Sequence, residues 1–390
     1  MRIVIDARPA LDPRRTGVGR YTRQLIRHLP FADPSSEVVA WYLHAKGLFR
    51  HHRFFDDGAA NLIERASRFP ARVFEPVASR IAMPKVEWLT GPFDTVIGTN
   101  FLPPATASDG AVLVVHDLAF ERFPHTAPQI DARWRRRFDR WLKRCSAVIV
   151  PSAATKGDLI SMHRVPEARV HVVHHGIEPF ATPDADAIAA TKRRFRIDGP
   201  YALFLGGIEP RKNLGALVEA FSRVPIDARL VIAGGPVRWI PQAEGRLRET
   251  VAALPADVRE RIVLTGYVTE QHATGLMAGA ELLAYPSLYE GFGFPVLEAM
   301  AAGVPVLTSD ASSLPEVAGE AALLVDPHDT GAITEGLRRL FEDDRLRSRL
   351  RAAGLERVRA FTWPETARRT AEVLHGGTPT SHGYTRPDGR

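Results

Sequence analysis

Glu290 and Glu298 are the two residues of this sequence best placed for group-transfer chemistry, because they frame a short glycine-containing segment. Gly291 and Gly293 lie between them, and so does Pro295. Glycines let the backbone approach a bound group closely, and proline is common in the first turn of a helix. The N-terminus of a helix offers unpaired N–H groups and a positive dipole end, which suit a diphosphate. We therefore predict a ligand-binding loop that leads into a helix.

In this prediction a strand ends near Tyr285 and the helix begins near Pro295. Glu298 then lies in the first helical turn, where its carboxylate can accept hydrogen bonds from a ribose diol. Glu290 lies before the loop and can reach a different part of the same ligand. The alternative is an ordinary strand–loop–helix turn, in which Glu298 only interacts favourably with the helix dipole. The spacing of two glutamates around two glycines and a proline favours the binding site.

A basic pair, Arg211 and Lys212, follows a second predicted strand. The next residue, Asn213, is of a type that favours the N-cap of a helix, which we predict at Leu214–Ser222. Two cations at that position could neutralise the charge that a leaving diphosphate gains as its bond to the transferred group breaks. The alternative is a solvated basic surface, which is common for such pairs.

The first half of the chain carries two further signals, neither of which is specific by itself. Gly17 and Gly19 are expected in a flexible loop before a helix that begins near Tyr21. His116 and Asp117 end a predicted buried strand. A histidine there is either a structural residue or part of a site.

Two patterns resemble metal sites, and we discount both. Asp184 and Asp186 form a D-x-D pattern, but they lie in a predicted linker. His171, His174 and His175 lie along one strand, where the first two point to opposite or mismatched faces and no acidic ligand is adjacent. We therefore predict no metal site.

The elements that must position these residues alternate between short apolar strands and helical stretches such as Arg20–Leu29 and Ala153–His163. Strands that are apolar throughout and separated by helices indicate an α/β protein with parallel sheets covered on both faces. In the first half the predicted strands are Arg2–Asp6, Glu37–Leu43, Asp94–Thr99, Ala111–Asp117, Ala147–Ser152 and Val170–His175. In the second half they are Tyr201–Leu205, Arg229–Ala233, Arg261–Thr265, Glu281–Tyr285, Pro305–Thr308 and Ala322–Val325.

We predict two domains, residues 1–178 and 200–375, joined by a linker at 179–199. The last helix is a candidate to pack back on the first domain, and the tail 376–390 is expected to be disordered because it is rich in Gly, Pro, Thr and Ser. Ligands of open α/β sheets bind at the carboxyl ends of the strands, so a cleft between two such domains is the expected site.

The composition indicates a globular protein but does not identify its ligand. The 390 residues are 45% apolar and 25% charged, which suits two domains with real cores. The formal charge of +6 suits nucleic acid, an anionic membrane or a phosphorylated substrate, and cannot choose among them. A single cysteine, Cys145, excludes an intrachain disulfide. With no signal peptide, no apolar run near the roughly 20 residues of a membrane span and no nucleic-acid-binding motif, we expect a cytoplasmic protein with no nucleic-acid partner.

Residues 129–145 form a predicted amphipathic helix that raises the hypothesis of peripheral membrane contact. Its apolar residues fall near one face, and its basic residues surround that face. Such a helix could lie on an anionic bilayer. The favoured alternative is a core-facing helix with a solvated basic side. The apolar residues are Ile130, Trp134, Phe138, Trp141 and Cys145, and the basic ones are Arg133, Arg135, Arg136, Arg137, Arg140, Lys143 and Arg144.

The sequence resembles the retaining glycosyltransferases of family 4, which have the GT-B fold, over essentially the whole chain up to about residue 375. Four motifs carry the resemblance. They are the E-x7-E segment that begins at Glu290, the G-x-x-E-P-R-K-N run that ends at Asn213, the T-G-V-G-R-Y run that ends at Tyr21, and the H-D pair at His116. Many relatives place an additional arginine shortly after the strand that precedes the second motif. This chain has Gly207 and Ile208 there, so the positive charge rests on the basic pair.

The resemblance implies two Rossmann-like domains that face each other across a cleft, the first binding the acceptor and the second the donor. Glu290 is implied to face the donor sugar, Glu298 to hold the nucleotide ribose, and His116 to contact the sugar. The implied catalytic residues are Glu290, His116, Lys212 and Arg211. The implied donor-binding residues are Gly17, Gly19, Gly207, Arg211, Lys212, Val268, Gly291, Phe292, Gly293, Phe294, Pro295, Val296 and Glu298. The nucleotide-diphosphate sugar is a substrate, and neither a cofactor nor a metal is expected.

The motif forms are similar to those of bacterial mannosyltransferases of surface polysaccharide synthesis. The first expectation is therefore transfer of a hexose, mannose from GDP-mannose, to a glycan or a polyprenyl-diphosphate-linked acceptor. UDP-glucose or another nucleotide sugar is the alternative donor. A sugar epimerase would react without an acceptor, and a phosphorylase would need phosphate or a cofactor lysine. The alternative of another class is a non-catalytic nucleotide-sugar-binding protein.

Overall fold

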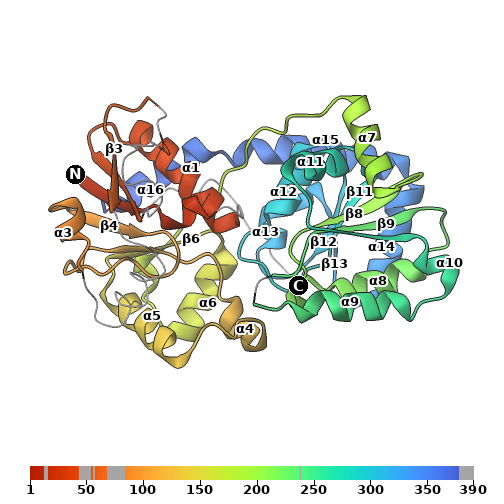
Figure 1. Cartoon of the computed structure of the whole chain (residues 1–390), viewed down its shortest axis with the longest axis horizontal. Helices are drawn as coiled ribbons and strands as arrows, with labels where there is room; N and C mark the ends of the chain where they lie inside the picture. The colour runs from red at the N-terminus through yellow and green to blue at the C-terminus, as the bar shows by residue number, and fades with distance from the viewer. Residues whose placement is uncertain (13–15, 44–53, 56–57, 68–83, 238, 377–390) are drawn as a thin grey trace. The chain divides into compact units, whose positions relative to one another are not determined.

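The computed structural model describes residues 1–12, 16–43, 54–55, 58–67, 84–237 and 239–376. The chain divides into two compact units, each built on one parallel β-sheet (Figure 1). The first unit contains Met1–Leu118, Ile130–Gly176 and Phe361–Arg390, and the second contains Ala119–Gln129 and Ile177–Ala360. The predicted α/β class is confirmed. The tail predicted at 376–390 lies, apart from Gly376, outside the described residues.

The sheet of the first unit has the strand order β3-β2-β1-β4-β5-β6-β7. Since β1 lies between β2 and β4, the strand order reverses at that point. The strands are β1 (Arg2–Asp6), β2 (Glu37–Leu43), β3 (Leu62–Ser67), β4 (Thr95–Gly98), β5 (Val112–Val114), β6 (Ala147–Val150) and β7 (Val170–Val172). The helices and 3₁₀ turns of this unit are η1 (Arg8–Leu11), α1 (Gly17–Ala32), α3 (Glu87–Thr90), α5 (Ala132–Arg144), α6 (Ala153–His163), η3 (Glu167–Arg169) and α16 (Trp363–Leu374).

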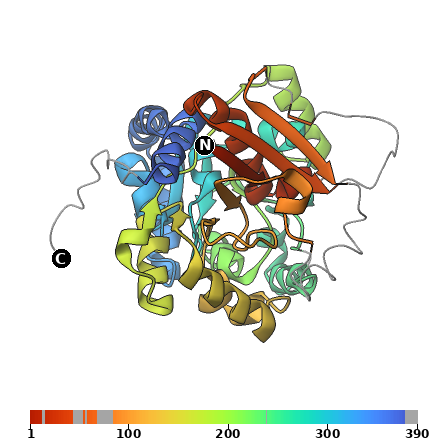
Figure 2. The same cartoon turned by 90° about the vertical axis from the view of Figure 1, so that its left-hand side faces the viewer.

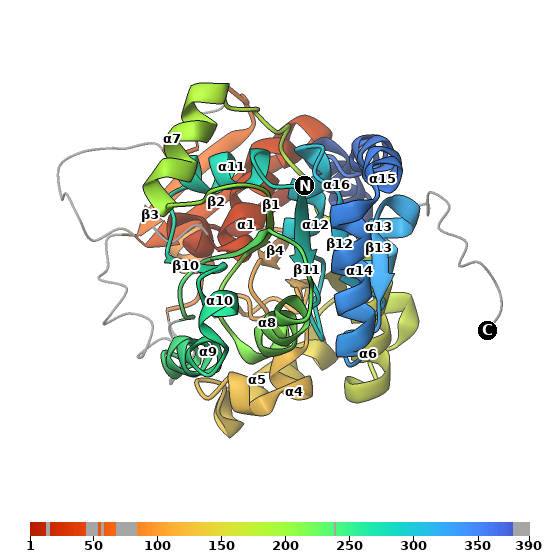
Figure 3. The same ribbon diagram turned by 90° about the vertical axis from the view of Figure 1, so that its right-hand side faces the viewer.

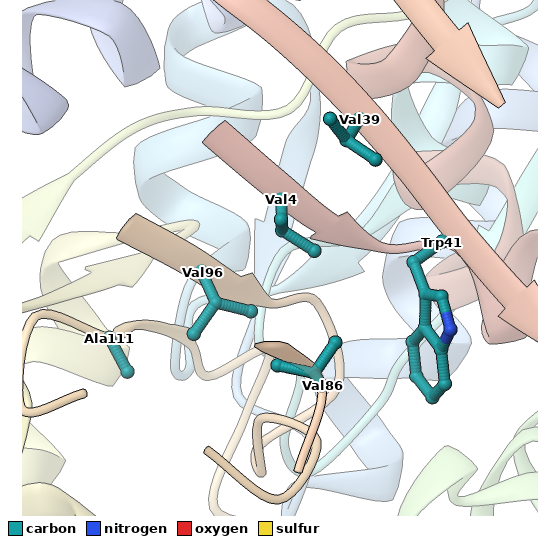
Figure 4. Packing of buried hydrophobic residues seen from close by; sticks show 6 residues of the cluster. All are labelled: Val4, Val39, Trp41, Val86, Val96 and Ala111. Atoms are coloured by element: carbon teal, nitrogen blue, oxygen red, sulfur yellow. The ribbon is translucent and has the colours of Figure 1, made fainter. Parts of the chain in front are cut away.

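Apolar side chains from neighbouring strands form a continuous layer in this unit (Figure 4). Val4 of β1 is in register with Val39 of β2 on one side and Val96 of β4 on the other. Trp41 extends the layer, and its indole N–H donates to Ser67 Oγ at 2.9 Å. Burial of the apolar surface on such strands supplies most of the stabilising free energy of a domain.

The last helix, α16, completes the first unit. Figures 1 and 2 show it, in blue, beside α1, in red, and the two helices contact each other. The hydroxyl of Thr366 donates to His174 O at 2.8 Å, and His375 Nε2 lies 2.8 Å from Asp33 Oδ2. A Cβ added to Gly176 would lie only 2.2 Å from Trp363 N, so only glycine fits at this contact.

The sheet of the second unit has the order β10-β9-β8-β11-β12-β13, and its order reverses between β8 and β11. Figure 3 labels its strands β10, β11, β12 and β13. The strands are β8 (Tyr201–Leu205), β9 (Arg229–Ala233), β10 (Ile262–Gly266), β11 (Leu282–Tyr285), β12 (Val306–Ser309) and β13 (Leu323–Val325). The longer helices are α7 (Ala185–Phe195), α8 (Leu214–Ser222), α9 (Gln242–Ala252), α11 (Glu270–Ala278), α12 (Phe294–Ala301), α14 (Thr330–Glu342) and α15 (Asp344–Arg357). The short elements are α4 (Ala119–Arg122), η2 (Pro124–Thr126), η4 (Pro210–Lys212), α10 (Ala256–Arg259), α13 (Leu314–Ala318), η5 (Gly319–Ala321) and η6 (Val358–Ala360).

The structure differs from the expected elements in three places. Strand β3 was not predicted, because its sequence lacks a continuous apolar run. Residues 179–199, expected as a linker with a possible helix but no strand, do contain the helix α7, but it packs on α11 and the segment groups with the second unit. Residues 119–129 also group with the second unit, although they lie within the range expected for the first domain. Among the described residues, no helix combines the length and the apolar character that crossing a membrane requires.

Candidate active site

Apart from Val268, the predicted donor-site residues of the second unit follow β8 and β11, the two neighbouring strands between which the strand order reverses. In open α/β sheets the loops at such a point diverge and leave room for a ligand at the carboxyl ends of the strands. The η4 turn follows β8 and carries Arg211 and Lys212. The loop after β11 carries Glu290, and Leu288 N in that loop donates to Arg211 O at 2.8 Å. Residues nearly 80 positions apart are thereby brought together.

Glu290 is the centre of a buried ionic cluster. One carboxylate oxygen, Oε2, accepts from Arg211 Nη1 at 2.8 Å, and the other, Oε1, pairs with Lys212 Nζ. Lys212 Nζ also donates to the hydroxyl of Tyr285 at 2.5 Å. The second terminal nitrogen of Arg211 lies 2.7 Å from Glu209 Oε1. Four charged side chains therefore share one site, with Tyr285 beside them.

Electrostatics keeps Glu290 ionised. Burial by itself would raise the pKa of its carboxyl, but the ion pairs with Arg211 and Lys212 outweigh burial and lower the pKa to about 2. Burial, and then the charge of Glu290, raise the pKa of Tyr285 well above its usual value. The tyrosine is thus a neutral hydrogen-bond partner in a cluster of fixed charges.

Hydroxyl groups from the end of β12 and the turn after it hold the Glu290 loop in place. Ser313 Oγ donates to Glu290 O and to Phe292 O, both at 2.9 Å. Ser312 Oγ donates to Glu290 O as well, and Ser309 Oγ donates to Ser287 O at 2.6 Å. These serines were not predicted from the sequence. Their clustering directly after a strand was the one available signal.

The helix after the loop begins one residue earlier than expected, at Phe294. Gly293 precedes it at φ 112°, a left-handed conformation that favours glycine, and an added Cβ would lie 2.8 Å from Leu314 Cδ2. Glu298 is consequently the fifth helical residue and not part of the first turn, as we had predicted. It is half-buried, one turn further from the N–H groups at the start of α12.

Asn213 precedes α8 as predicted, but its side chain does not cap that helix. The residue is in the left-handed conformation, at φ 60°, and its Nδ2 donates to Pro327 O at 2.7 Å. The side chain therefore ties the basic pair to the segment after β13 and leaves the first N–H groups of α8 without a side-chain acceptor from this residue.

Glycines line the carboxyl ends of β8, β9 and β10. Gly234 is packed so closely that an added Cβ would lie 1.9 Å from Gly206 O, and an added Cβ on Gly207 would lie 2.9 Å from Val237 Cγ1. Val268, a predicted donor-binding residue, is half-buried two residues after β10. The close approach of Gly234 was also missed from the sequence.

In the first unit His116 lies after β5 and not at its end, because β5 stops at Val114. Its Nε2 is 2.8 Å from Thr99 O, which can only accept, so Nε2 carries the proton. Its Nδ1 faces His175 Nε2 at 3.3 Å, and the ring of Tyr21 lies edge-on at 5.2 Å. Burial lowers the pKa of His116, and burial together with nearby positive charge lowers that of His175 further.

Gly17 and Gly19 lie in the first turn of α1 and not in a loop before it, which corrects the prediction. Thr16 is the N-cap, and its hydroxyl accepts from Gly19 N at 3.2 Å. An added Cβ on Gly19 would lie 2.7 Å from Pro9 O, so this glycine permits contact with η1. The same helix, α1, contains Tyr21, whose ring contacts His116.

The discounted patterns have structural roles. Asp184 caps α7, its carboxylate accepting from Ala187 N at 2.7 Å. His174 and His175 make separate contacts, with Phe361 and His116 respectively. No group of three potential metal ligands occurs among the residues that the structure describes.

The apolar face of α5 is turned to the interior of its own unit. Trp134 stacks on Phe138 with ring centroids 5.2 Å apart, and both rings contact Phe101. Phe138 and Leu142 are buried. This is the core-facing arrangement that the sequence favoured over a helix lying on a bilayer.

Two family models match the sequence. The one described as Glycosyltransferase Family 4 matches residues 15–179, and the one described as Glycosyl transferases group 1 matches residues 187–357. The O-antigen chain mannosyltransferase B of Escherichia coli is 29% identical over an alignment of 392 positions, gaps included. The alignment covers 95% of this chain and 98% of that protein. The serotype-specific mannosyltransferase WbdA of Escherichia coli is 30% identical over 232 residues, 58% of this chain and 28% of that protein.

Solved structures share the fold. The crystal structure of Anabaena HepE in complex with UDP and glucose has a TM-score of 0.71 at 16% identity, and the match covers 96% of this chain and 100% of that one. The crystal structure of WaaG, a glycosyltransferase involved in lipopolysaccharide biosynthesis, has a TM-score of 0.66 at 17% identity, covering 97% and 100%. These matches confirm the expected GT-B fold.

Proposed function

The chain belongs to glycosyltransferase family 4, and from this premise we propose that it transfers mannose from GDP-mannose to a glycan or polyprenyl-diphosphate-linked acceptor. The family assignment makes the chain a retaining glycosyltransferase that uses a nucleotide-sugar donor. The choice of mannose rests on the two Escherichia coli relatives, which are both mannosyltransferases. The similarity to the first of these relatives extends over 95% of this chain.

The buried cluster of Glu290, Arg211 and Lys212 is the observation that best supports catalysis over simple binding. Cations held rigidly beside the leaving diphosphate stabilise the charge that develops on it, and they need no reorganisation at the moment of reaction. The N-terminus of α12, with Gly291 to Val296 around it, would supply N–H groups to the same diphosphate. These groups make a divalent ion unnecessary for phosphate binding, so we propose a metal-independent reaction.

Glu290 is assigned an electrostatic role at the donor sugar. Both of its oxygens are engaged by cations, and its pKa of about 2 makes it a weak nucleophile. A carboxylate in that state stabilises positive charge near the anomeric carbon better than it forms a covalent bond. The leaving diphosphate is then the group that accepts the proton of the acceptor hydroxyl.

The remaining assignments follow the family resemblance. Glu298 would hold the ribose, Val268 and Gly207 would border the nucleotide, and His116 would contact the sugar. Because both ring nitrogens of His116 face protein partners, that contact needs a ring carbon, the backbone or a change of hydrogen bonding. Gly17 and Gly19 would approach the donor from the first turn of α1.

A panel of nucleotide sugars tests the proposal. Thermal unfolding is measured with GDP-mannose, UDP-glucose and the free nucleotides GDP and UDP, because a ligand that binds the folded state raises its stability. The donor that binds is then incubated with a lipid-linked oligosaccharide acceptor, and the anomeric configuration of the product is read by NMR. Transfer from GDP-mannose with retention supports the proposal. Transfer from UDP-glucose alone would show that UDP-glucose, and not GDP-mannose, is the donor. If the donor stays intact with every acceptor tested, a non-catalytic binding protein is favoured.

A further inference from the structure

Glu209 is a buried acidic residue that contacts Arg211 in the ionic cluster. Only 9% of its surface is exposed, and its Oε1 lies 2.7 Å from Arg211 Nη2. The other terminal nitrogen of Arg211 lies 2.8 Å from Glu290 Oε2. The guanidinium is therefore held between two carboxylates.

The cluster as a whole carries no net charge. Glu209 and Glu290 contribute two negative charges, and Arg211 and Lys212 contribute two positive ones. A site that only had to attract a diphosphate would gain from a surplus of positive charge. The neutral charge of the cluster therefore has another purpose than attraction of the diphosphate. Without Glu209 the other three side chains would carry one net positive charge.

The reaction changes the charge of the nucleotide. In a nucleotide-diphosphate sugar each phosphate bears one negative charge. The bond between the anomeric carbon and the phosphate oxygen breaks with its electron pair left on that oxygen, and the acceptor oxygen forms the new bond to the anomeric carbon. The acceptor hydroxyl passes its proton to the leaving diphosphate, which loses it to water at neutral pH. The new terminal phosphate has a second pKa of about 6, so at neutral pH the product carries roughly one more negative charge than the donor. Surplus positive charge would therefore hold the product more tightly than the donor.

We propose that Glu209 is a positioning residue for product release: through Arg211 it cancels the positive charge that would otherwise retain the nucleoside diphosphate. This proposal rests on the proposed function, because it needs a donor that becomes a more highly charged product. Glu209 acts through Arg211 and needs no contact with the ligand. The same ion pair fixes the direction of the guanidinium, so a test must separate charge from position.

Glu209→Gln provides that separation, since the amide keeps the size of the side chain and can still accept from Arg211. Affinities for GDP and GDP-mannose are measured by calorimetry at about pH 7.5 and about pH 5.5, on either side of the phosphate pKa. At the higher pH the variant should bind GDP about tenfold more tightly than the wild type and GDP-mannose about threefold more tightly. At the lower pH the two changes should converge, because most of the GDP has then lost its extra charge.

Two further variants serve as controls. Glu209→Asp keeps the charge and should restore the wild-type ratio of the two affinities. Glu219→Gln removes the same charge from α8 at an exposed ion pair with Arg223, and should leave both affinities unchanged. Equal changes for GDP and GDP-mannose at both pH values, or weaker binding of both, would overturn the proposal and leave Glu209 as a support for Arg211.

The wild-type protein supplies an independent measurement that needs no variant. Its affinities for GDP and GDP-mannose should differ by less than about threefold across this pH range. Binding of GDP more than about tenfold tighter than GDP-mannose at the higher pH contradicts a neutralising role for Glu209. If the wild type binds UDP and UDP-glucose instead, the donor assignment fails and the same comparison is made with that pair. If it binds none of the four, the proposed function itself fails.

Discussion

The two units place opposite kinds of chemistry beside their sheets. In the second unit Glu290, Arg211 and Lys212 form an ionic cluster whose members neutralise one another. In the first unit His116 and His175 form a hydrogen-bonded pair packed against Tyr21. Burial acts on both groups, but ion pairs outweigh it only for Glu290 in the second unit.

This difference explains why a lowered pKa means opposite things in the two units. For Glu290 a pKa of about 2 means that the side chain is charged at neutral pH. For His116 and His175 a lowered pKa means that the rings are neutral. Of the two clusters, only that of the second unit therefore carries formal charges at neutral pH, and the histidine pair is uncharged. Four experiments can break or sharpen this contrast.

The largest effect is expected from Glu290→Gln. The carboxylate stabilises charge that develops only in the transition state, so its loss should lower kcat by on the order of 30- to 1000-fold, with a smaller change in donor KM. Steady-state kinetics at saturating acceptor measures both constants, and Glu219→Gln serves as a surface control. A normal kcat for Glu290→Gln would show that the Glu290 carboxylate does not stabilise the transition state.

Glu298→Gln should have a smaller effect, and on a different constant. The ribose hydroxyls do not change during the reaction, so their contact is present in the ground state and the transition state alike. We expect donor KM to rise by about tenfold, with kcat largely retained. If Glu298→Gln loses kcat at saturating donor while Glu290→Gln keeps it, the two roles have been exchanged.

Acidification should affect the first unit before the second. The folded-state pKa values of His116 and His175 are lowered, so their contribution to stability is complete above about pH 6.5 and is lost as the pH falls below it. The contribution of Glu290 is complete above its ordinary pKa of 4.5 and is lost only as the pH falls from there toward about 2. At about pH 5.5 the two histidines should therefore lower the free energy of unfolding, while the contribution of Glu290 should be almost unchanged.

Tryptophan fluorescence can follow this loss, because five of the six tryptophans belong to the first unit: Trp41, Trp88, Trp134, Trp141 and Trp363, with Trp239 in the second. Trp363 also stacks over His175. The thermal midpoint should fall between about pH 7.5 and pH 5.5, and it should fall less in His175→Gln. A pH dependence that survives in His175→Gln but vanishes in Glu290→Gln would reverse the contrast between the units.

The smallest effect, no change, is expected from removal of divalent ions. Arg211, Lys212 and the N-terminus of α12 are assigned to the phosphates, so activity in excess chelator should equal activity without it. Activity that disappears in chelator and returns with Mg²⁺ or Mn²⁺ would show that this assignment of the phosphate ligands is incomplete.

The sequence predicted the strands well where they are apolar throughout, as in Arg2–Asp6, Glu37–Leu43 and Tyr201–Leu205. The family resemblance also put Glu290 and the basic pair in one site. They lie together in the structure because both follow strands that are neighbours in the sheet. The prediction failed where contacts are distant in sequence. The pairing of His116 with His175 and the hydroxyl groups that hold the Glu290 loop depend on tertiary packing that no local pattern encodes.

Local errors came from glycine. Gly17 and Gly19 suggested a loop, since glycine disfavours a helix interior, but the Thr16 cap and the close contact with Pro9 place both glycines in the first turn of α1. At Gly293 the error concerned the start of a helix, which lies one residue earlier than predicted. The left-handed conformation of Gly293 lets α12 begin at Phe294, which moves Glu298 out of the first turn.

The packing of α16 on α1 also determines the order in which the chain can fold during synthesis. Residues 363–374 are among the last described residues to leave the ribosome, yet they cover a helix that is made near the start. The first unit therefore remains incomplete until translation has passed the whole of the second. During that interval the apolar face of α1 is not yet covered by α16. Apolar surface exposed at this stage makes a nascent chain prone to aggregation.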